Sequence, residues 1–359
     1  MNKLRSMVKN SILGLTSIGD SAMDHMERYN NNWKLKHSYT SNMSELPMDY
    51  KREIQEYWKT YSSGFNTDWH RFYYSQFGLS DVRFIPDDLY YSNIDKHFNN
   101  RKMSIGVDEK NYYDLWFPNT KRAKVVVRRI NGIYYNENYT IIDKNEVIRL
   151  CLEQPQLIIK PSVGMGRSTG ITFLNRGQGE EGITKLIFEG NQNLVVQEII
   201  QQHDDLSRIH PSSVNTIRSI SLLFKGKVHL LSSILRMGID GNQVDNLSAG
   251  GIMCGIKENG QLKDIGYSLY GKPYNKHPQG FEFKGTTVPS YDRIKELIIR
   301  EQEKFAHFRL IYWDIAVGKD GEPILIEVNL CNGGMRFHQF NNGPLFGELT
   351  SEVLKEVFA

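Results

Sequence analysis

Cysteine is scarce in this chain of 359 residues, and neither sign of charge is in excess. Cys151, Cys254 and Cys331 are far apart and form no C-x-x-C pair. This spacing disfavours a disulfide framework or a structural zinc site and favours free thiols in a reducing cytoplasm. The formal net charge of +3 is too small for a dedicated nucleic-acid binder. No apolar run approaches the roughly 20 residues needed to cross a bilayer, so no membrane span is expected.

The composition is that of a folded protein with more than one lobe. Hydrophobic residues make up 40% of the chain and aromatic residues 11%, without an internal repeat or a low-complexity linker. A length of 359 residues suits two or three lobes better than a single core. Residues 1–20 place basic residues before a short apolar stretch that Gly14 and Gly19 interrupt. This pattern favours an amphipathic helix over a cleaved signal peptide.

Residues 1 to about 105 predict a mainly helical extension that is rich in aromatic side chains. The segment 50–61 has the pattern of a helix, and the segment 84–95 that of a loop followed by a helix. The interleaved rings could stack on nucleic-acid bases or form a core, and the missing basic excess favours the core. These rings belong to Trp58, Trp69, Phe72, Tyr73 and Tyr74.

Beyond residue 105 the pattern changes to strands with a few helices between them. Helices are expected near residues 143–153 and 290–308. The mixture predicts an α+β protein with mostly antiparallel sheets. Strand-like runs occupy residues 124–130, 157–160, 194–198, 217–224, 228–235, 312–317 and 324–329.

Residues 312–329 have the pattern of a β-hairpin around an Asp320-Gly321 turn. If those two residues form the turn, cross-strand partners have numbers that sum to 641, and Asp314 faces Glu327. A slip of one residue would mix the polar and apolar faces, so the pattern itself favours this register. The other expected pairs are Tyr312 with Asn329, Trp313 with Val328, Ile315 with Ile326 and Val317 with Ile324.

Two carboxylates that face each other across a sheet repel, because their Cβ atoms are about 4.5–5.5 Å apart. Asp314 and Glu327 therefore need a compensating cation. With Asn329 they offer oxygen ligands, which favour Mg²⁺ or Mn²⁺ together with nucleotide phosphates and waters. The alternative is that both acids form salt bridges to lysine or arginine on a solvated face.

Residues 157–171 predict a strand that ends at Lys160, followed by a loop with Gly164, Gly166 and Gly170. Small residues let backbone N–H groups approach phosphate oxygens, while the lysine supplies a point charge. The segment lacks the G-x-x-x-x-G-K-[ST] pattern, which disfavours a P-loop fold. An ordinary glycine-bearing hairpin is the structural alternative.

Three further charged side chains lie in apolar, strand-like runs. Glu198 could accept a hydrogen bond from the exocyclic amine of a purine, or could simply lead into a solvated loop. Arg218 and Arg236 would be costly to bury without a partner. A carboxylate or a phosphoryl group matches the planar guanidinium. The loop 244–252 that follows, VDNLSAGGI, is suited to lining a site.

Taken in chain order, these features resemble the ATP-grasp superfamily. The chain is most similar to its sugar-transfer-associated branch, whose members look like relatives of glutamate ligases and occur among polysaccharide-synthesis genes. The resemblance covers roughly residues 50–350 and implies an ATP-grasp fold, in which two α+β lobes grip ATP between antiparallel sheets. It is carried by DVRFIPDDLYY, HPSSVNTIRSIS, LSAGG, HPQGFEFKGTTVPSYD and WDIAV…ILIEVNLCNGG.

The resemblance also implies roles for individual residues. Lys160 would contact ATP phosphates, and residues 164–170 would form the lid. The lid reads GMGRSTG where many members have a glycine-glycine-lysine arrangement, and Arg167 is the candidate substitute. Arg218 and Arg236 would hold a carboxylate or a tetrahedral oxyanion. The other implied contacts are cofactor binding by Lys110, Gly164, Gly166, Gln197, Glu198 and Ile200, and Mg²⁺ binding by Asp314, Glu327 and Asn329.

The implied reaction is the ATP-dependent joining of a carboxylate to an amine through an acyl phosphate, with release of ADP and phosphate. The branch implies an amino acid or amine joined to a sugar acid during surface-polysaccharide synthesis in the cytoplasm. Glycan-synthesis proteins are candidate partners, and a homo-oligomer is a candidate assembly. A nucleotide-binding module without chemistry and a metabolite kinase are the alternatives.

The chain is expected to have three domains. A helical extension would span residues 1–105, a lid subdomain with the phosphate loop residues 106–200, and a C-terminal subdomain with the metal site residues 201–359. His277 either lines an acceptor pocket or structures the turn before Pro278.

Overall fold

A computed structural model of the protein describes residues 26, 28–33, 35, 43–62, 65–163, 170–245, 247 and 250–359. The predictions for the helix in residues 1–20 and for Gly164, Gly166 and Arg167 lie outside the described residues. The chain divides into two compact units, one of Met1–Asn99 with Gly334–Ala359 and one of Asn100–Gly333. The three domains predicted from the sequence stay a prediction. Within the described part of the chain, no helix is both long and apolar enough to span a bilayer.

The first unit is helical, as the sequence predicts, and buried rings form its core. Trp58, Trp69, Phe72 and Tyr73 are at most 2% exposed, whereas Tyr74 is half-buried. This unit also contains the C-terminal helices. Its elements are α2 (Met48–Trp58), α3 (Asp68–Phe77), α4 (Asp87–Leu89), η2 (Tyr90–Ile94), α5 (Asp95–Phe98), α12 (Met335–Asn342), η7 (Gly347–Leu349) and α13 (Thr350–Phe358).

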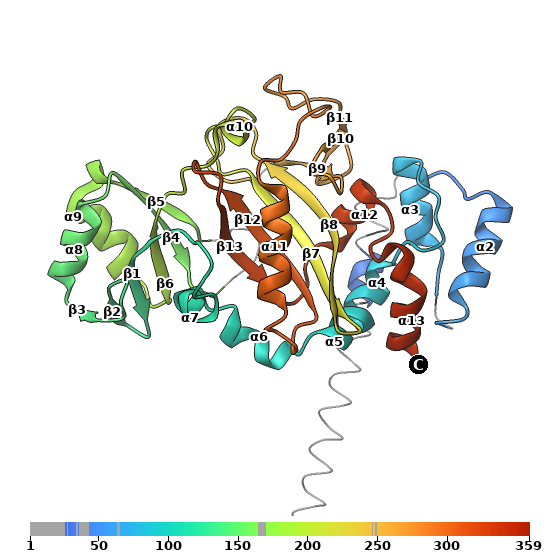
Figure 1. Ribbon diagram of the computed structural model, residues 1–359, viewed down its shortest axis with the longest axis horizontal. Coiled ribbons are helices and arrows are strands. Elements are labelled where there is room, and N and C mark those ends of the chain that lie inside the picture. The colour runs from blue at the N-terminus through green and yellow to red at the C-terminus, as the bar shows by residue number, and fades with distance from the viewer. Residues whose placement is uncertain are drawn as a thin grey trace, which may run out of the picture. The chain divides into compact units, whose positions relative to one another are not determined.

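The second unit contains two antiparallel sheets, which confirms the predicted α+β class (Figure 1). A six-stranded sheet has the order β3-β2-β1-β6-β4-β5, and Val127, Ile159 and Val196 from its strands are buried in one core. Short helices precede this sheet and cover it. Its elements are α6 (Arg101–Val107), η3 (Lys110–Tyr112), α7 (Tyr113–Trp116), β1 (Val125–Ile130), β2 (Ile133–Tyr135), β3 (Ile141–Ile142), α8 (Lys144–Leu152), β4 (Gln156–Pro161), β5 (Thr172–Asn175), η4 (Arg176–Gln178), α9 (Gly179–Ile183), η5 (Thr184–Phe188) and β6 (Leu194–Glu198).

The seven-stranded sheet has the order β11-β10-β9-β8-β7-β12-β13. Helix α11 packs across it, as Figure 1 shows, and buries Ile294 and Ile298 in the same core as Trp313. All eight residues of β12 are buried because this strand lies between two others. The elements are α10 (Asp204–Ser207), β7 (Thr216–Phe224), β8 (Lys227–Met237), β9 (Ile252–Ile256), β10 (Leu262–Ser268), β11 (Pro273–Tyr274), α11 (Tyr291–Gln302), β12 (Leu310–Val317) and β13 (Pro323–Asn329).

The β12–β13 hairpin has the predicted register at its polar end and a different register near its turn. Asp314 faces Glu327, and the neighbouring pairs Tyr312–Asn329 and Trp313–Val328 are also as predicted. The predicted pairs Ile315–Ile326 and Val317–Ile324 are wrong. The observed pairs are Ile315 with Leu325, Ala316 with Ile324 and Val317 with Pro323.

Two irregularities compensate each other along this hairpin. The N–H of Gly318 donates to the carbonyl of Glu322 at 2.9 Å, so the turn contains three residues rather than the predicted two. Gly321 adopts a left-handed backbone (φ 79°), as the last residue of such three-residue turns does. A bulge between Asp314 and Ile315 then leaves Ile326 as the extra residue and restores the predicted register at the acids.

Two connecting segments hold the six-stranded sheet beside this hairpin. Ahead of β1, Arg122 forms an isolated parallel bridge with Leu325 on β13, whose N–H donates to the carbonyl of Lys121 at 2.9 Å. After β6, Gln202 bridges to Gly318, and the N–H of His203 donates to the carbonyl of Val317 at 2.9 Å. The chain therefore enters and leaves the six-stranded sheet next to β12 and β13.

Candidate functional site

Strand register places the two acids opposite each other on the seven-stranded sheet. Asp314 on β12 faces Glu327 on β13 and, on its other side, Arg218 on β7. Asn329, two residues beyond Glu327, donates from Nδ2 to Asp314 Oδ2 at 3.4 Å. The three predicted metal ligands therefore lie next to one another, one on β12 and two on β13.

The two strand arginines have carboxylate partners. Arg218 Nη1 lies 3.1 Å from Asp314 Oδ2. Arg236 Nη1 lies 3.5 Å from Asp314 Oδ1, and its Nη2 donates to Asp245 Oδ1 at 3.1 Å. Asp245 also accepts a hydrogen bond from the hydroxyl of Thr216, the residue opposite Arg236 across β7 and β8. Asp314 therefore contacts both guanidinium groups.

The two predicted lysines come from the segments of the six-stranded sheet. Lys110 Nζ lies 2.8 Å from Glu327 Oε1. Lys160 is close enough to Glu327 and Lys110 to interact with both electrostatically. The N–H of Lys110 donates to the carbonyl of Ser162 at 2.8 Å, just beyond the end of β4 on which Lys160 lies. The backbone of Lys110 is therefore attached to the strand that carries Lys160.

Burial shifts the pKa values of these groups. It raises the pKa of Asp314, although Arg218 and Arg236 act in the opposite direction. Burial also acts to raise the pKa of Glu327, but Lys110 and Lys160 outweigh it and the pKa of Glu327 is lowered. Burial lowers the pKa of Lys160 to about 8; Glu327 opposes this shift and Lys110 adds to it.

Asp108 is an ionisable group near this cluster that the sequence did not suggest. Burial raises its pKa to about 7; the charge of Lys110 opposes this shift, and that of Glu327 adds to it.

The paired groups of the cluster carry one positive charge more than negative. Four cations (Lys110, Lys160, Arg218, Arg236) meet three carboxylates (Asp245, Asp314, Glu327), a difference of 4 − 3 = +1. Asp108, with a pKa of about 7, offsets this difference when it is ionised. The Nε atoms of Arg218 and Arg236 are buried and have no hydrogen-bond partner among the residues that the structure describes. Arg128 and Arg129, outside the cluster, also have buried Nε atoms without a partner in the described part of the chain, so it is the four cations of the cluster that suit an anionic ligand.

The oxygen donors of the site fit a hard divalent cation. Among the described residues, no group of three or more histidine, cysteine, aspartate and glutamate side chains could hold a metal ion. The predicted set is of another kind, since it joins the carboxylates of Asp314 and Glu327 to the side-chain amide of Asn329. Two carboxylates with nucleotide phosphates are a usual environment of Mg²⁺.

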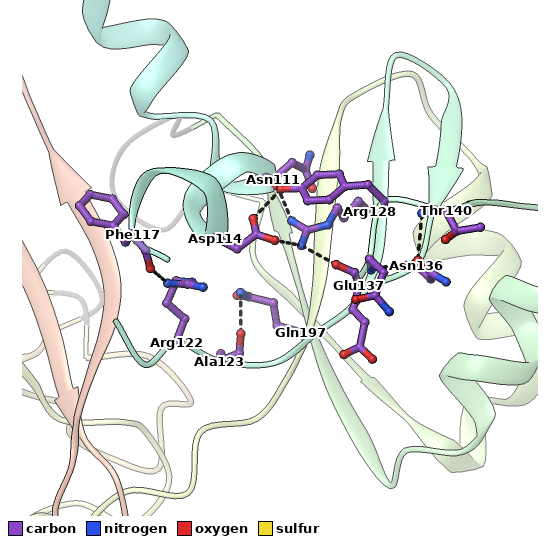
Figure 2. Close-up of polar contacts among 12 residues, drawn as sticks. Asn111, Asp114, Phe117, Arg122, Ala123, Arg128, Asn136, Glu137, Thr140 and Gln197 are labelled. Carbon is purple, nitrogen blue, oxygen red and sulfur yellow. Dashed lines mark hydrogen bonds and ion pairs between the residues drawn. The ribbon is translucent and has the colours of Figure 1, made fainter. Parts of the chain in front are cut away.

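The predicted adenine contacts lie at the end of β6. Glu198 is half-exposed and pairs with Lys124, with Oε1 3.3 Å from Nζ. Gln197 donates from Nε2 to the carbonyl of Ala123 at 3.4 Å, as Figure 2 shows. Ile200 follows the strand and is half-buried. These residues stay predictions as nucleotide contacts.

Gly170, at the end of the predicted lid loop, requires the absence of a side chain. Its backbone is left-handed (φ 81°), and a Cβ atom there would lie 2.8 Å from Pro161 Cγ. Gly170 therefore lies close to the end of β4, the strand of Lys160.

His277 structures a turn, as one of its two sequence interpretations has it. The side chain is fully buried, and Nε2 lies 2.8 Å from the carbonyl oxygen of Gly238. Its backbone N–H and C=O both bond within the turn, to the carbonyl of Phe281 and the N–H of Gly280.

Sequence reasoning missed several residues around the site. Arg128 on β1 contacts Asp114 and Asn111, next to Lys110 in the chain (Figure 2). Asp245 and Glu109 were not singled out either. One signal was available for Arg128, because it lies in the apolar run KVVVRRI, as Arg218 and Arg236 lie in theirs.

The fold with two antiparallel sheets is that of an ATP-grasp protein. The sequence matches the profile of the family described as sugar-transfer associated ATP-grasp over residues 91–354. The match covers well over half of the chain, and the protein belongs to this family.

Solved structures with a similar fold include three proteins that are each 14% identical to this chain. D-cycloserine synthetase DcsG matches with a TM-score of 0.42 over 71% of this chain and 73% of that chain. ATP-grasp ligase PsnB, solved with precursor peptide PsnA2 and AMPPNP, matches with a TM-score of 0.43 over 72% and 62%. D-alanyl-alanine synthetase A from Vibrio cholerae O1 biovar eltor str. N16961 matches with a TM-score of 0.40 over 70% and 64%. The matched region spans less than two thirds of the last two chains. No curated protein sequence matches the chain.

Proposed function

We propose that this protein is an ATP-dependent ligase that joins a carboxylate to an amine through an acyl phosphate. The observation that carries the proposal is the pair of opposed carboxylates, Asp314 and Glu327, inside a cluster of four cations. A bound Mg²⁺–triphosphate, which carries net negative charge, is attracted to a site lined by four cations.

The residues divide into three groups by what they would bind. Asp314, Glu327 and Asn329 would hold Mg²⁺, which supplies charge neutralisation at the phosphates. Lys110 and Lys160 would donate to phosphate oxygens. Arg218 and Arg236, with their buried Nε donors, would hold the substrate carboxylate and later the tetrahedral oxyanion. Adenine would lie at the end of β6, against Gln197, Glu198 and Ile200, and the segment with Gly164, Gly166 and Arg167 would close over the phosphates.

The reaction balances without a further reagent. A carboxylate oxygen of the substrate forms a bond to the γ-phosphorus, and the bond from that phosphorus to the β–γ bridging oxygen breaks, which releases ADP. The amine nitrogen then bonds to the acyl carbon, inorganic phosphate leaves with its oxygen, and the amine gives a proton to solvent. The arginine donors would stabilise the negative charge on the acyl oxygen during the second step.

We infer further that the substrates are an amino acid or amine and a sugar acid used in surface-polysaccharide synthesis. The description of the family, sugar-transfer associated, is the reason for choosing sugars as one substrate class to test. ATP supply places such a reaction in the cytoplasm, and proteins of glycan synthesis are the expected partners.

Acceptor-dependent release of ADP tests the proposal. The purified protein is incubated with ATP, Mg²⁺ and pools of amino acids and uronate sugars chosen by thermal shift, since binding to the native state raises Tm. The expected result is ADP release that requires both a carboxylate and an amine, with an amide found by mass spectrometry.

Two outcomes would replace the proposal with its alternatives. A stable phosphorylated product without an amide would make the protein a kinase on the same scaffold. Nucleotide binding without ADP release under any substrate pair would make it a non-catalytic nucleotide-binding module.

A further inference from the structure

A buried arginine links the six-stranded sheet to the segment that carries Lys110. Arg128 on β1 is only 2% exposed. Its Nη2 donates to Asp114 Oδ2 at 2.7 Å and to the carbonyl of Glu137 at 3.2 Å, and its Nη1 donates to the carbonyl of Asn111 (Figure 2). Burying a guanidinium is costly unless its donors have acceptors. The two Nη atoms have these three acceptors, which come from two segments outside β1, while Nε is buried without a partner among the described residues.

Tyr139 contacts Arg128 and two of its three acceptors, Asp114 and the carbonyl of Asn111. Its ring lies under the guanidinium, with the centroid 4.2 Å from Arg128 Cζ. Its hydroxyl lies 2.7 Å from the carbonyl oxygen of Asn111 and 2.5 Å from Asp114 Oδ1. The carbonyl of Asn111 is thus approached by two donors, one charged and one neutral.

The loop that presents Tyr139 is built to hold an unfavourable backbone conformation. Tyr139 has a φ of 60°, in the left-handed region that aromatic residues rarely adopt. The side chain of Asn136 accepts from the N–H groups of Asn138 and Thr140 at 2.9 and 3.0 Å and closes the loop. Strain of this kind persists only where surrounding contacts offset it, and here they are the contacts to Arg128 and Asn111.

These contacts fix the backbone of Lys110 on both sides. The residue after Lys110 is Asn111, whose carbonyl Arg128 and Tyr139 bind. The N–H of Lys110 itself donates to Ser162 at 2.8 Å, and Glu109 accepts from the hydroxyl of Ser162 at 2.9 Å. Lys110 is therefore tied to β1 and to the end of β4, while the carboxylate it contacts belongs to β13 of the other sheet.

We propose that Arg128 and Tyr139 are positioning residues for Lys110, holding its ammonium group where it meets Glu327 and the nucleotide phosphates. The inference rests on the proposed function for the phosphate contact alone. A lysine has four rotatable side-chain bonds, so a released backbone spreads its ammonium over many positions and weakens a hydrogen bond that depends on distance and angle. The effect of Arg128 on nucleotide binding must then pass through Lys110.

A double-mutant cycle on nucleotide affinity tests this route. The ligand is AMPPNP with Mg²⁺, titrated calorimetrically into the wild type, Arg128→Lys, Lys110→Met and the double variant. We expect Lys110→Met to weaken binding about 30-fold, in the range of a lost charged hydrogen bond, and Arg128→Lys about fivefold. The double variant should bind as weakly as Lys110→Met alone, within about twofold. Tyr139→Phe, which keeps the ring under the guanidinium, should show the same coupling with a smaller loss.

Arg129→Lys is the matched control in the same strand. Arg129 is also buried (7% exposed), but its Nη1 donates to the carbonyl of Ile187 at 3.3 Å, away from Lys110. Its effect should combine with Lys110→Met as the product of the two fold-changes. If Arg128→Lys and Lys110→Met also combine as a product, of about 150-fold, Arg128 acts on the lobe as a whole and the positioning role is rejected.

Amide hydrogen exchange without nucleotide separates this inference from the proposed function. Arg128→Lys should speed exchange at residues 110–112, and Arg129→Lys should leave it unchanged there. Unchanged exchange in Arg128→Lys would overturn the inference even if the protein is a ligase. If Arg128→Lys speeds exchange at these residues but the wild-type protein does not bind Mg²⁺–AMPPNP, the proposed function is rejected and the placement of Lys110 by Arg128 is retained.

Discussion

The acidic and basic parts of the site are held in different ways. In the hairpin, Asp314 and Glu327 face each other because β12 and β13 pair directly. Lys110, by contrast, is placed by Ser162 and Arg128, each in a different strand or loop of the six-stranded sheet. Replacing an acid should therefore abolish activity while strand pairing preserves the fold, and Asp314→Asn should also lower Tm because it removes the carboxylate that Arg218 contacts. Changes near Lys110 should act by moving it.

The largest expected effect concerns the acids. Asp314→Asn and Glu327→Gln keep the side-chain size but remove a charge that the metal and phosphates need. We expect each to lower kcat by at least about 10³-fold, since both the metal and the charge balance are lost, with cooperative unfolding retained. The measurement is ADP release together with a thermal denaturation curve.

Asp320→Asn in the turn of the same hairpin is the control. Its carboxylate is 55% exposed and pairs with Lys121, so kcat should stay within about twofold of the wild type. Full turnover in both acid variants would show that Asp314 and Glu327 do not bind the metal. The contrast between the acidic and the basic parts of the site would then fail as well.

The second prediction tests the basic region through pH. Lys160 has a pKa of about 8, so its ammonium form is lost above that pH in the ligand-free protein. Affinity for Mg²⁺–ATP should fall by up to about tenfold per pH unit above pH 8. Lys160→Arg stays charged over this range, so its affinity should stay flat. A wild-type profile that is flat to pH 10 would show that Lys160 does not bind the phosphates as a cation.

The same shift predicts how stability changes with pH. The folded pKa of about 8 lies below the ordinary value of 10.5, so between these values the unfolded chain binds more protons than the folded chain. The free energy of unfolding of the wild type, relative to Lys160→Met, should therefore rise from pH 8 to 10.5. Urea unfolding at pH 7.5 and 10 measures it, and a relative decrease would contradict the burial of this charge.

A third, smaller effect is expected at Arg236. Asp245 accepts from Arg236 Nη2 at 3.1 Å and from Thr216, so Asp245→Asn should loosen the guanidinium without removing it. We expect KM for the carboxylate substrate to rise about tenfold, as for one weakened charged hydrogen bond, with a smaller change in kcat. Thr216→Val should raise KM less. An unchanged KM in both would place the carboxylate elsewhere.

The smallest effect is expected at Glu198, which is half-exposed and pairs with Lys124. Glu198→Ala should raise KM for ATP about threefold, because exposed interactions contribute little. If the side chain accepts from the exocyclic amine, the wild type should prefer ATP to inosine triphosphate, and the variant should lose that preference. If the wild type and the variant discriminate between ATP and inosine triphosphate to the same extent, Glu198 has no role in base recognition.

Much of the hairpin could be predicted from the sequence because strand alternation is a local property. The alternation of polar and apolar residues identified the pairing of Asp314 with Glu327. The predicted pairs nearer the turn were wrong, because the amino-acid sequence does not distinguish a two-residue turn from a three-residue turn combined with a bulge at Ile326. The two errors cancel at the acids, which is why the prediction held where the charges lie.

The basic region could be predicted only in part. Lys160 was identified by its place at a strand end before a glycine loop, Lys110 by likeness to a family, and Arg218 and Arg236 by the cost of burying them. The partners of Arg128 are 14 or more residues away in the chain or lie in a loop whose left-handed Tyr139 has no sequence signature. Contacts of this kind depend on how the segments pack, and no local pattern encodes them.

The binding of Mn²⁺ by the hairpin acids tests the central claim most directly. Electron paramagnetic resonance of Mn²⁺ with AMPPNP measures the bound ion in the wild type, Asp314→Asn, Glu327→Gln and Asp320→Asn. The account predicts a bound, protein-perturbed Mn²⁺ signal in the wild type and in Asp320→Asn, and only the signal of the free Mn²⁺–nucleotide complex in the two acid variants. An unchanged protein-bound signal in both acid variants would contradict it.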